Sequence, residues 1–365
     1  MLGENLRLTR QQRGWTLESL SSQTNIPVSS LSEFETGSRE PRLGHLQVLA
    51  RTYGRPIASF FEPRAESEVV LWRERPADAH SAKIEGEFLE LCRRYRSLED
   101  WCGEHVRCAL PEHEPNGDRI DWAGAQTLAN LVRNQLNLGS HPSASLLTVL
   151  ENTCGVRIFH LKFEPTGTAA CTRDAHLGMA VLLNASSKRW RRNFDLAHEL
   201  FHLLTWKFFR QGDNAKCATA REEQLADCFA SALLMPEDAL KDALGAAARS
   251  GGGLKRAELF DVARQFDVSV EALLWRLRVV FNRSEPDTRH DITVCKSMQS
   301  QLEIREDTAP RLLPERYHAL ARRALRNGEL SVGRAAEYLG ISRKEAMALD
   351  DFEDIDDEPI SLGLA

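Results

Sequence analysis

The pentapeptide HELFH at residues 198–202 constrains what this chain can fold into more than any other feature. The residues around it have the pattern of one long helix, and a spacing of four returns His198 and His202 to the same helical face about one turn apart. Two imidazoles placed in this way can hold one metal ion, and HExxH on a helix is typical of zinc peptidases. The motif therefore predicts a metal centre inside a folded core.

The next predicted helix, residues 219–235, supplies a candidate third ligand. Glu223 lies 21 residues beyond His202, and its carboxylate would complete a set of two histidines and one carboxylate with the fourth zinc position open. Asp227 follows one turn later on the same helical face, where it can accept the free ring N–H of a ligand histidine. Glu222 is the alternative ligand, and the spacing favours Glu223 because only Glu223 has such a partner four residues on.

Glu199 lies between the two histidines and has a different predicted role. In this position it can take a proton from a zinc-activated water as that water attacks a peptide carbonyl, and then give the proton to the leaving amine. A second electrophile is expected for the oxyanion. The strands predicted before this helix offer three candidates that the sequence leaves unranked, namely His176, Arg173 and His160.

Cys171 lies in a short strand predicted at residues 167–173, between stronger strands at 156–163 and 179–184. Two interpretations are open: an inhibitory thiolate that occupies the fourth zinc position, or a small half-buried residue of the strand. The same strand is predicted to form a sheet edge on which an extended substrate peptide could pair.

The N-terminal part of the chain has the periodicity of short helices separated by turns. Thr16 is a predicted N-cap, and after a turn at Asn25 the apolar residues Val28, Leu31 and Phe34 recur at the spacing of one buried face. A fourth helix is predicted to close this core through Leu43, Leu46, Ala50 and Tyr53.

The stretch TLESLSSQTNIPVSSLSEFETG, with the segment from Arg39 to Pro41 after it, resembles the XRE-type helix-turn-helix family. The resemblance implies that the second helix of the motif enters the major groove and that Ser29, Ser30, Glu33 and Arg39 are the candidates that face DNA. A carboxylate at Glu33 would face phosphates, so weak or partner-assisted binding is expected. The alternative is a domain used only for interaction or dimerisation.

The chain has 365 residues, enough for several domains, and its 42% hydrophobic content is that of a globular protein. The predicted fold class is mainly α, with an α+β zincin-like metallopeptidase domain and an N-terminal all-α helix-turn-helix domain. The expected division is 1–63 helix-turn-helix, 64–119 helical linker or docking segment, 120–282 zinc metallopeptidase, 283–349 C-terminal helical domain with a possible second helix-turn-helix, and 350–365 acidic tail.

The segment at 64–119 contains a heptad-like seam formed by Ile84, Phe88, Leu91, Tyr95, Leu98 and Cys102. Such a seam could pair with its copy in a homodimer or dock on a neighbouring domain. The residues from 283 to 313 are polar and are not predicted to be helical, and helices are expected again from Pro314.

Charge and cysteine content limit the partners and the compartment. The net charge of −6 includes seven acidic groups at 350–358, so the remainder of the chain is near +1 and a nucleic-acid partner is not excluded. The eight cysteines contain no CxxC pair and are expected to be reduced. No apolar run is long enough for a membrane span, so no membrane partner and a cytoplasmic location are expected.

The sequences FDLAHELFHLL and EEQLADCFASALLMP together are similar to the ImmA/IrrE family of zinc metallopeptidases. The similarity implies Zn²⁺ as cofactor, His198, His202 and Glu223 as its ligands and Glu199 as the general base. It also implies a function, in which a regulatory endopeptidase cleaves a cognate helix-turn-helix repressor and so derepresses stress, DNA-damage or phage-defence genes.

Two further hypotheses concern DNA. Single-stranded DNA is a candidate activator that could bind the basic helices and aromatic residues such as Trp190. The alternative function is a DNA-binding transcription regulator that uses the metallopeptidase-like domain as a ligand sensor. The intact HELFH and Glu223 favour the enzyme, because a sensor would be free to lose Glu199.

Overall fold

The computed structural model describes most of the chain, namely residues 2–12, 15–53, 57–61, 69–73, 78–106, 110–111, 120–166, 168–210, 217–251, 255–302 and 309–349. The expected acidic tail at 350–365 lies outside these residues. None of the described helices is both long enough and apolar enough to cross a lipid bilayer.

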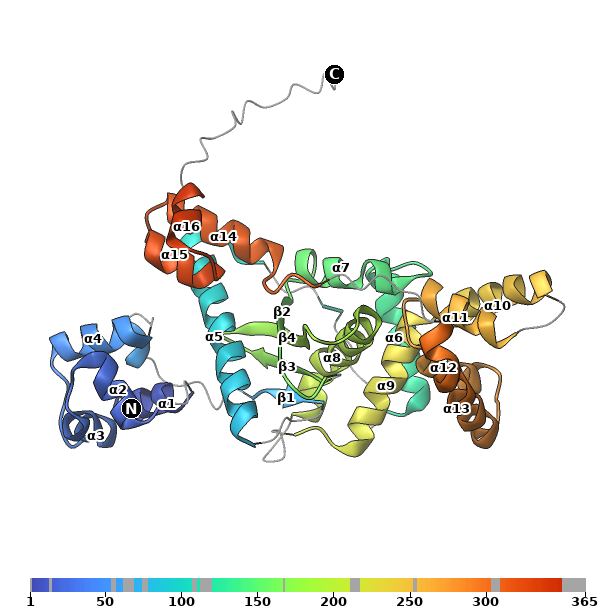
Figure 1. Cartoon of the computed structure of the whole chain (residues 1–365), viewed down its shortest axis with the longest axis horizontal. Coiled ribbons are helices and arrows are strands. Elements are labelled where there is room, and N and C mark those ends of the chain that lie inside the picture. Colours follow the sequence, from blue (N-terminus) through green and yellow to red (C-terminus); the bar gives the residue numbers. More distant parts are fainter. Residues whose placement is uncertain are drawn as a thin grey trace, which may run out of the picture.

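The N-terminal helices form a separate small core (Figure 1). Their bounds are α1 Leu2–Gln12, α2 Leu17–Thr24, α3 Val28–Thr36, α4 Leu43–Tyr53 and the 3-10 turn η1 Ile57–Phe60. The Thr16 side chain caps α2 by accepting from the Ser19 N–H, as predicted, and Asn25 ends this helix in a left-handed conformation. α2 and α3 therefore form a helix-turn-helix.

Two residues expected in this core lie at the surface. Val28 is 36% exposed and Leu43 is 64% exposed, whereas Leu31, Phe34 and Tyr53 are buried as predicted. Val28 and Leu43 are each the first residue of a helix, where the apolar face has only begun. The periodicity therefore identified the face but not its limits.

A small sheet lies at the centre of the molecule (Figure 1). Its strand order in the described part of the chain is β1-β3-β4-β2, and the strands are β1 Leu71–Trp72, β2 Arg157–Leu161, β3 Ala169–Asp174 and β4 Gly178–Asn184. β3 is antiparallel to both β1 and β4, whereas β2 is parallel to β4. Three of the four strands were predicted.

The expectation that β3 forms a free sheet edge is wrong. β1 pairs with it, so that Leu71 lies opposite Cys171 and Trp72 lies opposite Ala170. The Arg73 N–H also donates to the Ala169 carbonyl at 3.1 Å. The sequence did not reveal β1, because two residues are too few to show an alternating pattern. A peptide can pair with β3 at these residues only by displacing β1.

One face of the sheet packs against the helices that carry the HELFH motif and the acidic residues after it. Ile158, Cys171 and Val181 point into this layer. Its first elements are α6 Trp122–Gln135, η2 Pro142–Ala144, α7 Leu146–Asn152, α8 Arg189–Phe209 and α9 Ala220–Leu234. α8 crosses β3 and β4, and α9 packs on α8 and α6. The contact between α8, α9 and the sheet is therefore buried.

The opposite face of the sheet is covered by a long helix, on which three C-terminal helices continue the same core (Figure 1). These helices are α5 Asp78–Cys102, α14 Glu315–Arg326, α15 Val332–Leu339 and α16 Arg343–Ala348. Phe88 and Tyr95 of α5 meet the ring of Phe159 edge-on, and Tyr317 of α14 meets the same ring. The seam predicted in α5 therefore docks within the chain, which is the second of its two interpretations.

The remaining helices extend the layer of α8 and α9 away from the sheet. They are α10 Glu237–Gly251, α11 Arg256–Gln265, α12 Val270–Val280 and α13 Glu285–Leu302. The expectation that the segment after 283 is not helical is wrong for α13, whose Thr288, Ile292 and Cys295 are buried at a spacing of four and three on one face. Only two of these three residues are apolar, so the pattern was too sparse to recognise.

Candidate metal centre

Three side chains from α8 and α9 converge on one point. The Nε2 atoms of His198 and His202 lie 3.2 Å apart. Glu223 Oε2 lies 3.0 Å from His198 Nε2, and Glu223 Oε1 lies 3.4 Å from His202 Nε2. We call these three residues the His-His-Glu cluster; one donor atom from each lies within 4.8 Å of the others. The predicted spacing on α8 thus produces the geometry that a shared ion requires.

The other ring nitrogens are held by two carboxylates. His198 Nδ1 lies 2.9 Å from Asp227 Oδ1, and His202 Nδ1 lies 2.9 Å from Glu222 Oε1. Each Nδ1–H can therefore donate to a carboxylate, which leaves each Nε2 lone pair free to bind a metal. Asp227 lies where the sequence predicted an orienting residue. Glu222 has the same orienting geometry toward His202, which the sequence analysis missed.

The charges of the cluster follow from these contacts. Burial acts to lower the pKa of His202, but its hydrogen bonds to Glu222 and Glu223 outweigh burial and raise the pKa to about 9. Burial acts to raise the pKa of Glu223, and the two histidines outweigh it and lower the pKa to about 2. Glu223 is therefore ionised at neutral pH, as a carboxylate ligand must be.

Glu199 lies on the side of α8 that faces β3. It is completely buried, and within the described residues neither of its carboxylate oxygens has a hydrogen-bond partner of normal geometry. Burial raises its pKa, and the charges of His202 and His198 and a contact with the Cys171 thiol oppose that rise. An unsatisfied buried carboxylate is costly to a fold, so its presence calls for a role other than packing.

Cys171 lies beside Glu199 and is completely buried on β3. Burial, followed by the nearby charge of Glu199, raises the pKa of its thiol. Among the described residues, the ligand atoms that lie close enough together to share an ion come only from the His-His-Glu cluster, so Cys171 is not part of that set. The thiol contacts Glu199, and its role as an inhibitory ligand at the fourth zinc position stays a prediction.

Two of the three oxyanion candidates lie at the hairpin between β3 and β4. His176 is exposed in the turn, where its backbone N–H donates to Asp174 Oδ1 at 2.7 Å. Arg173 Nη1 donates to the Leu203 carbonyl of α8 at 2.7 Å, which ties the hairpin to the helix. No described contact joins His176 to the His-His-Glu cluster, and its role in the reaction stays a prediction.

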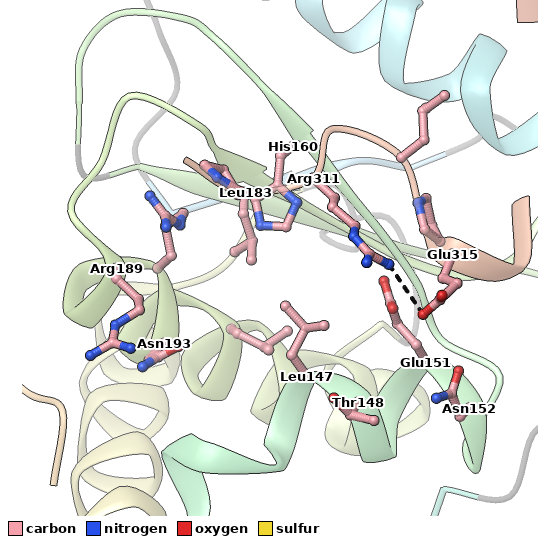
Figure 2. A pocket seen from close by; sticks show the side chains of 15 residues that line it. Leu147, Thr148, Glu151, Asn152, His160, Leu183, Arg189, Asn193, Arg311 and Glu315 are labelled. Atoms are coloured by element: carbon pink, nitrogen blue, oxygen red, sulfur yellow. Dashed lines mark ion pairs between the residues drawn. The ribbon is translucent and has the colours of Figure 1, made fainter. Parts of the chain in front are cut away.

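The third candidate, His160, lies elsewhere. Its ring lines a cavity of about 340 Å³ between α7, α8 and residues 310–315 (Figure 2), and this cavity contains none of the His-His-Glu cluster. Burial and the charge of Arg192 lower the pKa of His160 to about 4, so its ring is neutral at physiological pH. The expectation that His160 serves the oxyanion is wrong, because β2 is separated from β3 by β4.

The same cavity gives a testable pH dependence. Burial, followed by the charge of Glu315, raises the pKa of Glu151 to about 7 against the opposing charge of Arg311 (Figure 2). The folded state therefore holds this proton more tightly than the unfolded state, and the wild type loses stability as the pH rises through the window from about 4.5 to about 7.

We expect a Glu151→Gln variant, whose amide does not titrate, to avoid this loss. Its thermal midpoint should be higher relative to that of the wild type at pH 8 than at pH 5. Thermal unfolding of both proteins at the two pH values tests this, and an equal difference at pH 5 and pH 8 would contradict the assignment of the titrating group to Glu151.

The candidate DNA-facing residues lie together on the helix-turn-helix. Ser29 and Arg39 are exposed, and Ser30 and Glu33 are partly exposed. Arg39 Nη1 lies 3.5 Å from Glu33 Oε2, so the carboxylate expected to repel phosphates has a cation beside it. Their role in DNA contact stays a prediction.

The donor set of the His-His-Glu cluster fits zinc. Two imidazole nitrogens and one carboxylate form a ligand type of catalytic zinc sites, in which a further position stays open. Both histidines also have the carboxylate partners that orient ligand histidines in metal proteins. The residues are therefore suited to hold Zn²⁺.

Comparison with known proteins agrees with this geometry. The model of the IrrE N-terminal-like domain, a peptidase family, matches residues 152–278, and a helix-turn-helix model matches residues 6–60. The HTH-type transcriptional regulator DdrOP3 of Deinococcus deserti is 30% identical over 121 residues, which are 33% of this chain and 89% of that protein. This chain belongs to the IrrE-like family and carries a helix-turn-helix domain.

Within this family the chain combines a metallopeptidase-like domain with a domain type that implies DNA binding and transcription regulation. A structural comparison aligns 82% of the chain with 94% of Bacillus thuringiensis PlcR, solved with the peptide PapR7 and DNA. The identity is 13% and the TM-score is 0.17.

Proposed function

We propose that this IrrE-like protein is a regulatory zinc endopeptidase that cleaves a cognate helix-turn-helix repressor and thereby derepresses stress, DNA-damage or phage-defence genes. The observation that carries the proposal is the buried Glu199 carboxylate, which has no hydrogen-bond partner of normal geometry among the described residues and lies on α8 between His198 and His202. A purely structural zinc site has no use for such a group, whereas peptide hydrolysis requires a base there.

The chain's own residues account for the proton transfers. Zinc held by the His-His-Glu cluster would supply a Lewis acid for the peptide carbonyl and the attacking water. Glu199 accepts a proton from that water as the water oxygen bonds to the carbonyl carbon. When the C–N bond breaks, Glu199 gives the proton to the leaving nitrogen, so the carboxylate is regenerated. Asp227 and Glu222 keep the two imidazoles oriented throughout.

The helix-turn-helix domain would supply substrate selection. It has a core of its own and contacts the rest of the chain where α1 meets α5 (Figure 1), and it can bind the DNA that the repressor occupies or the repressor itself. Either contact raises the local concentration of the cleavable segment near the His-His-Glu cluster. The substrate specificity of the peptidase would then depend on this tethering to the repressor or its DNA.

Incubation of the protein with the repressor that is encoded beside the protein's own gene tests this function. The purified protein is mixed with the repressor, with and without single-stranded DNA and with and without a zinc chelator, and fragments are separated by mass. We expect one new pair of fragments that disappears on chelation, and a faster reaction with single-stranded DNA if that DNA is the activator. An intact repressor under every condition, while zinc is bound, would refute the proposal.

Cys171 is the proposed inhibitory residue. Because its thiol contacts the carboxylate that must receive the proton, we expect a Cys171→Ala variant to cleave severalfold faster than the wild type in the absence of an activator. Initial rates on the same repressor measure this. A matched Cys154→Ala variant, which removes another buried thiol, should leave the rate unchanged, and equal rates for both variants would exclude inhibition by Cys171.

A second candidate function is favoured by the name of the relative. DdrOP3 is described as a transcriptional regulator, and by analogy this chain would bind DNA and use the metallopeptidase-like domain to sense a ligand. Zinc binding without cleavage, together with sequence-specific DNA binding, is the result that would favour it.

A further inference from the structure

Arg73 connects the two helices that form the His-His-Glu cluster. It follows β1 directly, and its backbone is fixed to β3 by the hydrogen bond to Ala169. Its Nη1 lies 2.7 Å from Asp195 Oδ1 on α8, and its Nη2 lies 2.8 Å from Asp227 Oδ1 on α9. One planar guanidinium therefore clamps a carboxylate from each ligand-bearing helix.

The clamp acts on the same oxygen that orients a metal ligand. Asp227 Oδ1 accepts from Arg73 and also lies 2.9 Å from His198 Nδ1. The Asp227 side chain is 49% exposed, so on its own it could rotate away from the histidine. Asp195 is 1% exposed and lies one turn before His198, so it gives Arg73 a rigid anchor.

We propose that Arg73 is a positioning residue of the metal centre, which holds Asp227 so that His198 keeps the tautomer and orientation needed to bind zinc. The inference rests on the zinc site of the proposed function and not on its substrate. The family model begins at residue 152, so Arg73 comes from a segment of the chain outside the matched domain.

The full-length protein allows a direct test by zinc affinity. Zinc is titrated against a fluorescent chelator for the wild type, Arg73→Gln, Arg73→Lys and Arg191→Gln. Arg191 is a matched control, because it pairs with the same Asp195 at 3.0 Å but this pair lies within α8. We expect the zinc dissociation constant to rise about tenfold for Arg73→Gln, to rise less for Arg73→Lys, which keeps the charge but not the fork, and to stay unchanged for Arg191→Gln.

A double-mutant cycle with Asp227→Asn separates positioning from a general effect on the fold. If Arg73 acts through Asp227, adding Arg73→Gln to Asp227→Asn should weaken zinc binding little further. A full tenfold loss in that background, or equal affinities for Arg73→Gln and Arg191→Gln, would overturn the proposal. Thermal unfolding of the metal-free variants identifies any that fail to fold. If Arg73→Gln fails to fold, the zinc affinity of Arg73→Lys is compared with those of the wild type and Arg191→Gln instead.

The outcomes also separate this inference from the proposed function. Zinc binding that depends on Arg73 in a protein that cleaves no repressor would support the positioning role and refute the peptidase. Cleavage by a protein whose zinc affinity does not depend on Arg73 would support the peptidase and refute the positioning role. A wild type that takes up no zinc would overturn both.

Discussion

A Glu199→Gln variant should cleave the repressor about 10²- to 10⁴-fold more slowly than the wild type, the range typical for loss of a general acid–base group. The amide has the size of the carboxylate but cannot take a proton from water. Glu199 is not a member of the His-His-Glu cluster, so the variant should bind zinc as tightly as the wild type. Its fold should also persist, since a neutral amide is less costly to bury than an ionised carboxylate.

Single-turnover rates on the repressor and zinc titration of the same preparations measure both expectations. A variant that keeps the wild-type rate would show that Glu199 is not the base. A variant that loses zinc would show that Glu199 supports the metal centre instead, and its loss of activity would then carry no information about proton transfer.

Replacing each of the two adjacent glutamates on α9 by glutamine, one at a time, should have very different effects on zinc affinity. Glu223→Gln removes a ligand that faces both Nε2 atoms, so we expect zinc affinity to fall by more than about 100-fold, beyond the 10- to 100-fold typical for an orienting partner. Glu222→Gln leaves the ligands in place but weakens the hydrogen bond that orients His202, so its loss should lie within that range.

Competition with a zinc chelator measures this pair of variants, and each serves as the other's control because both replace one carboxylate by an amide in the first turn of the same helix. If Glu222→Gln loses more affinity than Glu223→Gln, the roles of ligand and orienting residue are reversed. If neither variant loses affinity, the metal is bound elsewhere.

Local patterns predicted the central part of this molecule. The spacing of His198 and His202 on one helix and of Glu223 and Asp227 on the next is a property of helical geometry, so the sequence could place these residues on facing sides before their distance was known. The N-cap at Thr16 and the buried face of α3 are local in the same way.

Contacts between distant segments could not be predicted in this way. Arg73 is 122 residues from Asp195 and 154 residues from Asp227, and nothing in its own sequence context indicates these partners. His160 was assigned to the wrong surroundings because the sequence predicts strands but not their order in the sheet. Glu222 was considered only as a rival ligand, since its hydrogen bond to His202 depends on how α9 packs on α8.

The position of Arg73 also determines how this protein can be divided. A fragment limited to residues 152–278 would keep every zinc ligand but would lose β1, the Arg73 clamp and the long helix α5 that covers one face of the sheet. A fragment that keeps β1 and the Arg73 clamp must therefore begin before residue 69, a few residues after the helix-turn-helix core ends at Phe60. In this chain, a swap of the helix-turn-helix domain that spares the Arg73 clamp would have to be joined between Phe60 and residue 69.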